Sequence, residues 1–249
     1  MEFFAASWSL IQANLTEMSA IWFLAPVVSM FKGEQGCPFP GLRNRNNRCY
    51  LNSLLQALAS LPPNILSTKH PLLNDLFQTV KWLRHKSSCL DYVLPGSWNS
   101  DQQDPHEFYL AMVPLLEKTH KCSLLSLSAF EGTCLEGGKV TPFSFILVYS
   151  GAEEVNFEDN LLTMPCVLVL LYLQPTSATP RLKLSHQGIV YSLASMIIRR
   201  GHSAYSGHYY AVCKRGNAWI KADDEHTEFV KESQISEYTP YMSFYELRR

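Results

Sequence analysis

The spacing of apolar positions changes about halfway along the chain. Leu51, Leu54, Leu55 and Leu58 recur on one helical face, and Pro62-Pro63 ends that pattern. Helix signals continue to about residue 120, and strand signals dominate afterwards, with buried strands predicted at 143–149 and 167–173. The pattern therefore predicts an α+β fold, helical in its first half and β-rich in its second.

A second helix is predicted to begin at Pro105. Asp104 is a good N-cap residue, proline is favoured at the first helical position, and Glu107 stands where a capping box places an acid. The apolar face of this helix would consist of Phe108, Met112, Leu115 and Leu116.

Residues 208–223 are predicted to form a hairpin, with strands at 208–213 and 218–223 and a loop at 214–217. If Cys213 opposes Ala218, then His208 lies directly opposite Asp223, with Cβ atoms roughly 5 Å apart. One face is then apolar and suited to a core (Tyr209, Ala211, Cys213, Ala218, Ile220, Ala222). The other face places an imidazole beside a carboxylate, which fixes the tautomer and stabilises the protonated ring. The Lys214-Arg215 pair is expected to be solvated charge in the turn.

Cys49 is expected in the first turn of the helix that contains Leu51. The unpaired N–H groups and the positive end of the helix dipole favour a thiolate there. Asn44 lies in the turn-rich stretch before it, where its amide is a candidate donor to an oxyanion. Taken singly, a cysteine at a helix start is usually a small buried hydrophobe, and a strand histidine is usually just hydrogen-bonded.

Four motifs, in order from Gly41 to Arg249, resemble the ubiquitin-specific protease family of deubiquitinases. The family's cysteine box reads roughly Gly-Leu-x-Asn-x-Gly-Asn-Thr-Cys-Tyr-x-Asn-Ser, and its histidine box reads Gly-His-Tyr, then a tryptophan, then a paired acid. The segments 102–108 and 241–246 resemble two further family elements. The matching residues of the two boxes are Gly41, Leu42, Asn44, Asn47, Cys49, Tyr50, Asn52 and Ser53, and then Gly207, His208, Tyr209, Trp219, Asp223 and Asp224.

The resemblance implies a papain-like cysteine protease fold, with a helical thumb, a β-rich palm and a cleft between them. It also implies roles for five residues. Cys49 would be the nucleophile, His208 the general base, Asp223 the third triad member, Asn44 the oxyanion donor and Asp224 a supporting acid. The implied activity is that of a cysteine-type ubiquitinyl hydrolase, and the implied partners are ubiquitin and ubiquitinated proteins.

Three departures bear on that expectation. Asn46 stands where the family has glycine, and Arg48 stands where it has threonine, which places a cation beside the thiol. Many members also carry a zinc-binding fingers region with two Cys-x-x-Cys pairs, whereas the seven cysteines here contain no close pair. We therefore expect a reduced or absent fingers region, no zinc and no other cofactor, with Cys134 as a remnant of the first pair.

Composition is consistent with a reduced intracellular protein. The 249 residues carry a formal net charge of -1, which gives no reason to expect nucleic acid binding. Seven scattered cysteines read as free thiols in the cytosol rather than as a disulfide framework.

Residues 1–40 form an apolar-rich segment that precedes the expected catalytic domain, 41–249. Its uncharged run from Met18 to Phe31 contains Pro26 and is shorter than the roughly 20 residues that a spanning helix needs. Glu2 has the wrong sign for a signal peptide. We expect a packed helix or a tail and a cytoplasmic protein. The alternative is membrane association through residues 3–31, as in the short family member anchored on the mitochondrial outer membrane, facing the cytosol.

Two other functions remain open at this point. A ubiquitin-binding scaffold with weak catalysis would fit the altered cysteine box and the missing fingers. A protease for another ubiquitin-like modifier would keep the chemistry and change the substrate.

Overall fold

The computed structural model describes residues 37–45, 47–66, 68–69, 71–85, 103–116, 129–149, 161–173, 178–201 and 207–248. The chain divides into two units, Met1–Gln35 and Gly36–Arg249, and all of these residues belong to the second. The sequence-based boundary between residues 40 and 41 stays a prediction, and the candidate anchor at 3–31 lies outside the described residues. Among the residues that are described, no helix is long and apolar enough to cross a membrane.

The helices come first along the chain, as predicted. They are α2 (Cys49–Leu58), α3 (Pro71–His85) and α4 (Pro105–Met112), with short 3-10 turns at η1 (Pro63–Ile65) and η2 (Val113–Leu115). α2 begins at Cys49 and ends before Pro62-Pro63, which confirms the predicted helix. α4 has the predicted cap, because the Asp104 side chain accepts a hydrogen bond from the His106 backbone N–H and Pro105 occupies the first helical position.

A large sheet follows, with strand order β10-β9-β8-β7-β11-β5-β3 and with β6 paired to β7. Neighbouring strands are antiparallel except for the parallel pair β3–β5. In chain order the strands are β3 (Ile146–Val148), β5 (Val167–Tyr172), β6 (Lys183–His186), β7 (Ile189–Arg200), β8 (His208–Arg215), β9 (Ala218–Asp223), β10 (His226–Val230) and β11 (Pro240–Leu247). The 3-10 turn η3 (Glu232–Glu237) separates β10 from β11.

Both predicted strands are present, but only the second is buried along its whole length. β5 is buried at every position, as expected for 167–173. The strand expected at 143–149 is divided, because Phe143 ends β2 (Lys139–Phe143) and the second piece is β3.

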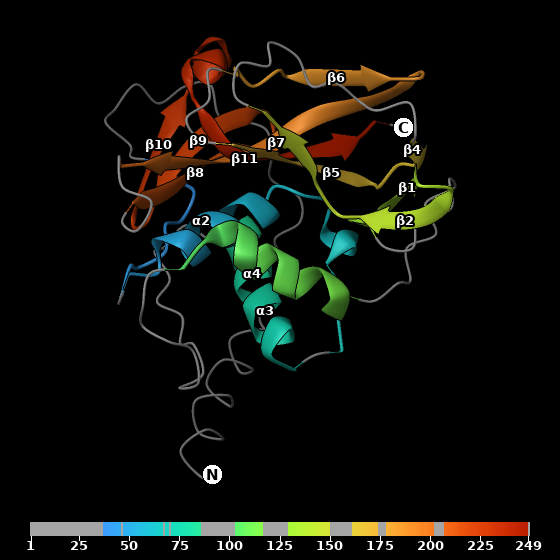
Figure 1. Ribbon diagram of the computed structural model, residues 1–249. Coiled ribbons are helices and arrows are strands. Elements are labelled where there is room, and N and C mark those ends of the chain that lie inside the picture. The colour runs from blue at the N-terminus through green and yellow to red at the C-terminus, as the bar shows by residue number, and fades with distance from the viewer. Residues whose placement is uncertain are drawn as a thin grey trace, which may run out of the picture. The chain divides into compact units, whose positions relative to one another are not determined.

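The central strands of the large sheet are buried on both faces. The helices lie against one face, with α2 nearest the strands (Figure 1). Residues of α2, α3 and α4 form one core with Val169, Ile197, Tyr209 and Phe244 of that face. The opposite face forms a second core that includes Tyr210, Val212, Trp219 and Ile235.

The hairpin is real, but its predicted register is wrong by two residues. Cys213 pairs with Ile220 rather than Ala218, and Arg215 pairs with Ala218 across the turn at Gly216-Asn217. Gly216 has φ +59°, which a two-residue hairpin turn requires. Because side chains alternate with a period of two, this shift leaves both predicted faces unchanged. It does mean that His208 and Asp223 are diagonal neighbours rather than directly opposed.

Arg215 is also a correction to the sequence analysis. It is the last residue of β8 and is only 7% exposed, so it is not a solvated turn residue. Cys213, by contrast, lies in the core as expected, fully buried.

A small three-stranded sheet has the order β2-β1-β4, where β1 is Gly132–Glu136 and β4 is Leu161–Thr163. Cys134 lies in β1, and its Sγ is 3.5 Å from the carbonyl oxygen of Thr141 on β2. This sheet occupies the place along the chain where the family resemblance implied a reduced fingers region.

Candidate active site

Cys49 occupies the position that the helix pattern predicted. It is the first residue of α2 and is 4% exposed. The backbone carbonyl of Arg48 accepts hydrogen bonds from the N–H groups of Leu51 and Asn52, which closes the first turn around the thiol. The positive end of the helix dipole is thus directed at the sulfur, an arrangement that favours a thiolate.

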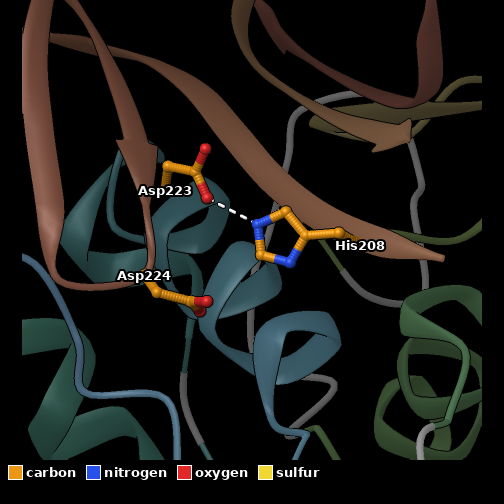
Figure 2. Close-up of side chains that lie close together, drawn as sticks. All are labelled: His208, Asp223 and Asp224. Atoms are coloured by element: carbon orange, nitrogen blue, oxygen red, sulfur yellow. Dashed lines mark hydrogen bonds and ion pairs between the residues drawn. The ribbon is translucent and has the colours of Figure 1, made fainter. Parts of the chain in front are cut away.

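His208 and Asp223 come from neighbouring strands, β8 and β9, and their side chains point at each other (Figure 2). The imidazole Nε2 lies 2.5 Å from Asp223 Oδ1. The His208 side chain is 40% exposed and that of Asp223 is 23% exposed. The pair is therefore half-open to solvent, as a site that admits a substrate must be.

The thiol and the imidazole are in contact. The pKa of His208 is raised from 6.5 to about 9, and the largest cause is its hydrogen bond with Cys49; burial opposes the shift, and Asp223 adds to it. Since Nε2 is bonded to Asp223, the other ring nitrogen, Nδ1, is the one left for the thiol. At neutral pH this environment favours an imidazolium held between sulfur and carboxylate.

Lys221 is a neighbour of the pair to which the sequence analysis gave no role. Its Nζ lies 3.7 Å from Asp223 Oδ2 and 3.0 Å from Glu228 Oε1. It occupies the same face of β9 as Asp223, as the alternation of side chains along the predicted strand implies. Its ammonium charge balances the second oxygen of the carboxylate that orients His208.

Asp224 connects the hairpin to the segment that contains Cys49. Its Oδ2 accepts a hydrogen bond from Asn44 Nδ2 at 2.8 Å, and its Oδ1 accepts one from Asn52 Nδ2 at 2.7 Å. Asp224 has φ 51°, in the turn between β9 and β10, a backbone conformation that Asp tolerates better than most residues. Burial raises the pKa of Asp224, and the hydrogen bonds from the two amides offset part of that rise.

Asn52 is a second site residue to which the sequence analysis gave no role. It is 2% exposed, and its amide also lies 3.3 Å from the carbonyl oxygen of Leu42. The available signal was its place in the cysteine box, three residues after Cys49, on the same side of α2.

Asn44 is held in place from both ends of its side-chain amide. Besides the bond to Asp224, its Oδ1 accepts a hydrogen bond from the Arg48 backbone N–H at 2.8 Å. An amide NH₂ has two N–H donors, and the bond to Asp224 uses one of them. This fixed orientation is compatible with the predicted oxyanion donor, which stays a prediction.

Gly41 explains why this segment can lie so close to the hairpin. A Cβ added there would lie 2.3 Å from the carbonyl oxygen of Glu225, so only glycine fits. The next residue, Leu42, donates its backbone N–H to the Asp224 carbonyl oxygen at 2.8 Å. The segment before Cys49 therefore packs against the same turn that carries Asp224.

The two departures in the cysteine box have different outcomes. Asn46 lies outside the described residues, so its tolerance in place of glycine stays a prediction; the next residue, Asn47, which matches the family, has a left-handed conformation with φ 58°. Arg48 precedes the helix as its N-cap residue and is partly exposed.

The third family motif fastens α4 to the sheet. Asp104 caps α4 with Oδ1, and its Oδ2 accepts hydrogen bonds from the hydroxyls of Tyr241 at 2.6 Å and Tyr209 at 3.2 Å. Tyr209 directly follows His208, so this bond places the helical layer close to the catalytic strand.

Within the described part of the chain, His208, Asp223 and Asp224 could meet at a metal ion, since their ligand atoms lie within 4.8 Å of one another. The same atoms already satisfy one another and their amide neighbours, as the contacts above show. The arrangement therefore has the donor pattern of a thiol–imidazole–carboxylate site.

Comparisons with known proteins agree with this geometry. Residues 153–245 match the family model described as ubiquitin carboxyl-terminal hydrolase. That match contains His208, Asp223 and Asp224 but begins after Cys49. A search of curated proteins found no match.

Solved structures cover nearly the whole chain. The SAGA DUB module of Ubp8, Sgf11, Sus1 and Sgf73 bound to monoubiquitin matches with a TM-score of 0.60, 18% identity and coverage of 97% of this chain and 75% of that one. The yeast SAGA DUB module with an altered Sgf73 matches with a TM-score of 0.64, 20% identity and coverage of 96% and 72%. An essential yeast splicing factor matches with a TM-score of 0.64, 14% identity and coverage of 85% and 70%. The family resemblance and the predicted fold, a helical part packed on a β-rich part, are thereby confirmed.

Proposed function

We propose that this chain is a thiol-dependent deubiquitinase, which hydrolyses the isopeptide or peptide bond at the C-terminal glycine of ubiquitin. The observation that carries the proposal is the contact of Cys49 with His208, whose far nitrogen lies 2.5 Å from Asp223. The ubiquitin carboxyl-terminal hydrolase match and the likeness to a module bound to monoubiquitin support the substrate.

In the first half-reaction, the Cys49 thiolate attacks the carbonyl carbon of the glycine, and the carbonyl electrons move to its oxygen. The second N–H of the Asn44 amide and backbone donors near the start of α2 would stabilise that oxyanion. When the tetrahedral intermediate collapses, the C–N bond breaks and the lysine amine takes the proton from His208 Nδ1. A thioester between Cys49 and ubiquitin remains.

In the second half-reaction, water gives a proton to the now neutral imidazole and attacks the thioester carbonyl. The C–S bond breaks, ubiquitin leaves as a carboxylic acid that loses its proton to solvent, and the thiolate and imidazolium are restored. Asp223 keeps the ring oriented and stabilises its charge in both half-reactions. These two half-reactions use no cofactor.

The proposal is tested with an isopeptide-linked ubiquitin substrate. We expect Cys49→Ala to abolish turnover while ubiquitin binding is retained, because the thiol takes part in bond formation and covers little surface. Equal rates for wild type and Cys49→Ala would refute a thiol mechanism.

The scaffold hypothesis is the second candidate, and two observations favour it. The same fold occurs in a protein described as a splicing factor, so the fold alone does not fix catalysis. Arg48 also replaces the family's threonine beside Cys49. A scaffold would bind ubiquitin with an affinity that Cys49→Ala leaves unchanged and would show no turnover in wild type.

A protease for another ubiquitin-like modifier keeps the same residues. The small sheet β2-β1-β4 stands in place of zinc-binding fingers, so the contacts with the modifier would differ from those of family members that have fingers. Parallel assays with ubiquitin and with other modifiers, each linked through its C-terminal glycine, separate the two substrates.

We also propose that the protein acts in the cytoplasm on ubiquitinated proteins and does not bind nucleic acid, as its net charge of -1 suggests. Attachment to the mitochondrial outer membrane through residues 3–31 is the alternative location.

A further inference from the structure

The C-terminal end of α2 holds two guanidinium groups. Arg215 donates hydrogen bonds from Nη2 to the backbone oxygen of Gln56 at 2.8 Å and to its Oε1 at 2.9 Å, and from Nη1 to Ser60 Oγ. Arg84 donates to the backbone oxygens of Leu58, Ala59 and Leu61 at 3.3, 3.1 and 2.8 Å. Together they bind the carbonyl oxygens that a helix end leaves without partners in the helix.

Both cations are placed where the helix dipole is negative, which favours them. Burial lowers the pKa of each guanidinium, and the charge of Arg215 lowers that of Arg84 further, so the two groups are close enough to repel. Keeping two like charges close together at a largely buried helix end costs free energy. This cost suggests that the two arginines have different tasks.

The two arginines come from different elements. Arg84 lies on α3, within the helical layer. Arg215 is the last residue of β8, and the first residue of the same strand is His208. α2 begins at Cys49, which touches His208, and its other end is bonded to Arg215. The helix with the thiol and the strand with the imidazole are thus joined at both ends.

Gln56 extends this connection to the segment before the thiol. Its Oε1 accepts from Arg215, and its Nε2 donates to the backbone oxygen of Pro40 at 2.8 Å. Pro40 precedes Gly41, which is seated on the turn of Asp224. Arg215 therefore orients the amide that holds the cysteine box against the hairpin.

We propose that Arg215 is a positioning residue, which sets the alignment of Cys49 on α2 with His208 on β8. The inference rests on the proposed thiol chemistry and assigns to this arginine a task that Arg84 does not share. A displacement of about 1 Å between reacting groups costs on the order of 10²-fold in rate. The bonds from Arg215 to the C-terminal end of α2 oppose a displacement of α2 along β8.

The test compares Arg215→Met with Arg84→Met in the full chain. Each variant removes one guanidinium from the same helix end, but only the first removes the link to β8. We expect Arg215→Met to lower kcat by about 10- to 100-fold with little change in KM. We also expect the pKa of His208, followed by imidazole NMR, to fall from about 9 toward 6.5, because contact with Cys49 is the largest cause of its rise. Arg84→Met should leave both quantities near wild type.

Equal effects of the two variants, or an unchanged His208 pKa in Arg215→Met, would overturn the inference. If Arg215→Met does not fold, Arg215→Lys answers the question, because an ammonium keeps the charge and lacks the fork that reaches Gln56 and Ser60 together. We expect Arg215→Lys to lower kcat and the His208 pKa, each by less than Arg215→Met. A kcat and a His208 pKa equal to those of wild type would count against the inference. If the wild type lacks activity on ubiquitin but Arg215→Met still shifts the His208 pKa, the proposed substrate fails and the positioning role stands.

Discussion

At the scale of single residues, the site depends on how His208 is protonated. Its imidazole lies between the Cys49 thiol and Asp223, and its pKa is about 9 rather than 6.5. A raised histidine pKa stabilises the folded state fully below pH 6.5, and this contribution is lost as the pH rises through about 9. The same proton is the one that the leaving amine must receive.

We therefore expect kcat/KM for the ubiquitin substrate to decline on the alkaline side with an apparent pKa near 9. Asp223→Asn removes a charge that supports the imidazolium, so it should move this decline to lower pH and reduce the rate less than loss of the thiol. A pH–rate profile of both proteins checks this prediction. An Asp223→Asn profile that coincides with wild type would show that the carboxylate does not act on His208.

Asp224 offers a second test at this scale. Asp224→Asn replaces an acceptor that holds the amides of Asn44 and Asn52, and we expect a fall in kcat of about 10-fold or more as the oxyanion donor loses its orientation. Glu225→Gln, in the same turn and exposed, is the matched control and should keep the wild-type rate. Similar rates for both variants would mean that Asp224 only shapes the turn.

The site residues that could be predicted from the sequence are those that belong to a recognisable sequence motif. The motifs predict that Cys49, His208 and Asp223 lie together, and in the structure His208 contacts both Cys49 and Asp223. Arg215 was assigned to solvent, because a charged residue next to Gly216 ordinarily marks an exposed turn. Its burial depends on the carbonyl oxygens at the end of α2, which belong to a distant part of the chain.

At the scale of elements, the hairpin shows what periodicity can and cannot determine. Alternation predicted both faces of β8 and β9 correctly, since a two-residue shift preserves them. Loop length was the source of the error, because Lys214 and Arg215 continue the strand and leave a two-residue turn. The helix start at Cys49 and the α4 cap were predictable because both depend on neighbours in sequence.

The docking of the cysteine segment on this hairpin is testable at Gly41. A Cβ there would meet backbone atoms of Glu225 and Asp224, so Gly41→Ala should force the segment and the turn apart. We expect a loss of about 1–3 kcal/mol in the free energy of unfolding, together with a lower kcat in the molecules that remain folded. Chemical denaturation and active-fraction kinetics measure the two effects.

Gly137→Ala is the control, because Gly137 has φ +54° and open space around it. It should cost stability through backbone strain alone and leave the rate of the folded protein unchanged. If Gly41→Ala loses stability without losing kcat, the close approach serves folding and not the site.

At the scale of the whole molecule, the described unit is a helical layer packed on a sheet whose central strands are buried on both faces. The site lies where the first turn of α2 meets the ends of β8 and β9, so it can exist only when both layers are formed. The two layers were predictable because the spacing of apolar positions changes from a helical to a strand period along the chain. The sequence could not predict the strand order β10-β9-β8-β7-β11-β5-β3, because the pairings β7–β11, β11–β5 and β5–β3 join strands that are not consecutive in the chain.

The proposed location can be tested at residues 3–31, the candidate anchor. We expect the protein to be released into the soluble fraction on carbonate extraction, since the uncharged run from Met18 to Phe31 is short and contains a proline. A variant that lacks residues 3–31 is the control and should behave in the same way. Retention of the full-length chain in the membrane pellet, with release of the variant, would establish an anchor instead.

The most direct test of the central claim is the reaction of the purified protein with a ubiquitin that carries a thiol-reactive group at its C-terminus, followed by intact mass. A single adduct is predicted for wild type, no adduct for Cys49→Ala, and slowed formation for His208→Ala. An adduct of the same mass on Cys49→Ala, or no adduct on a folded wild type that still binds ubiquitin, would contradict a thiol enzyme at Cys49.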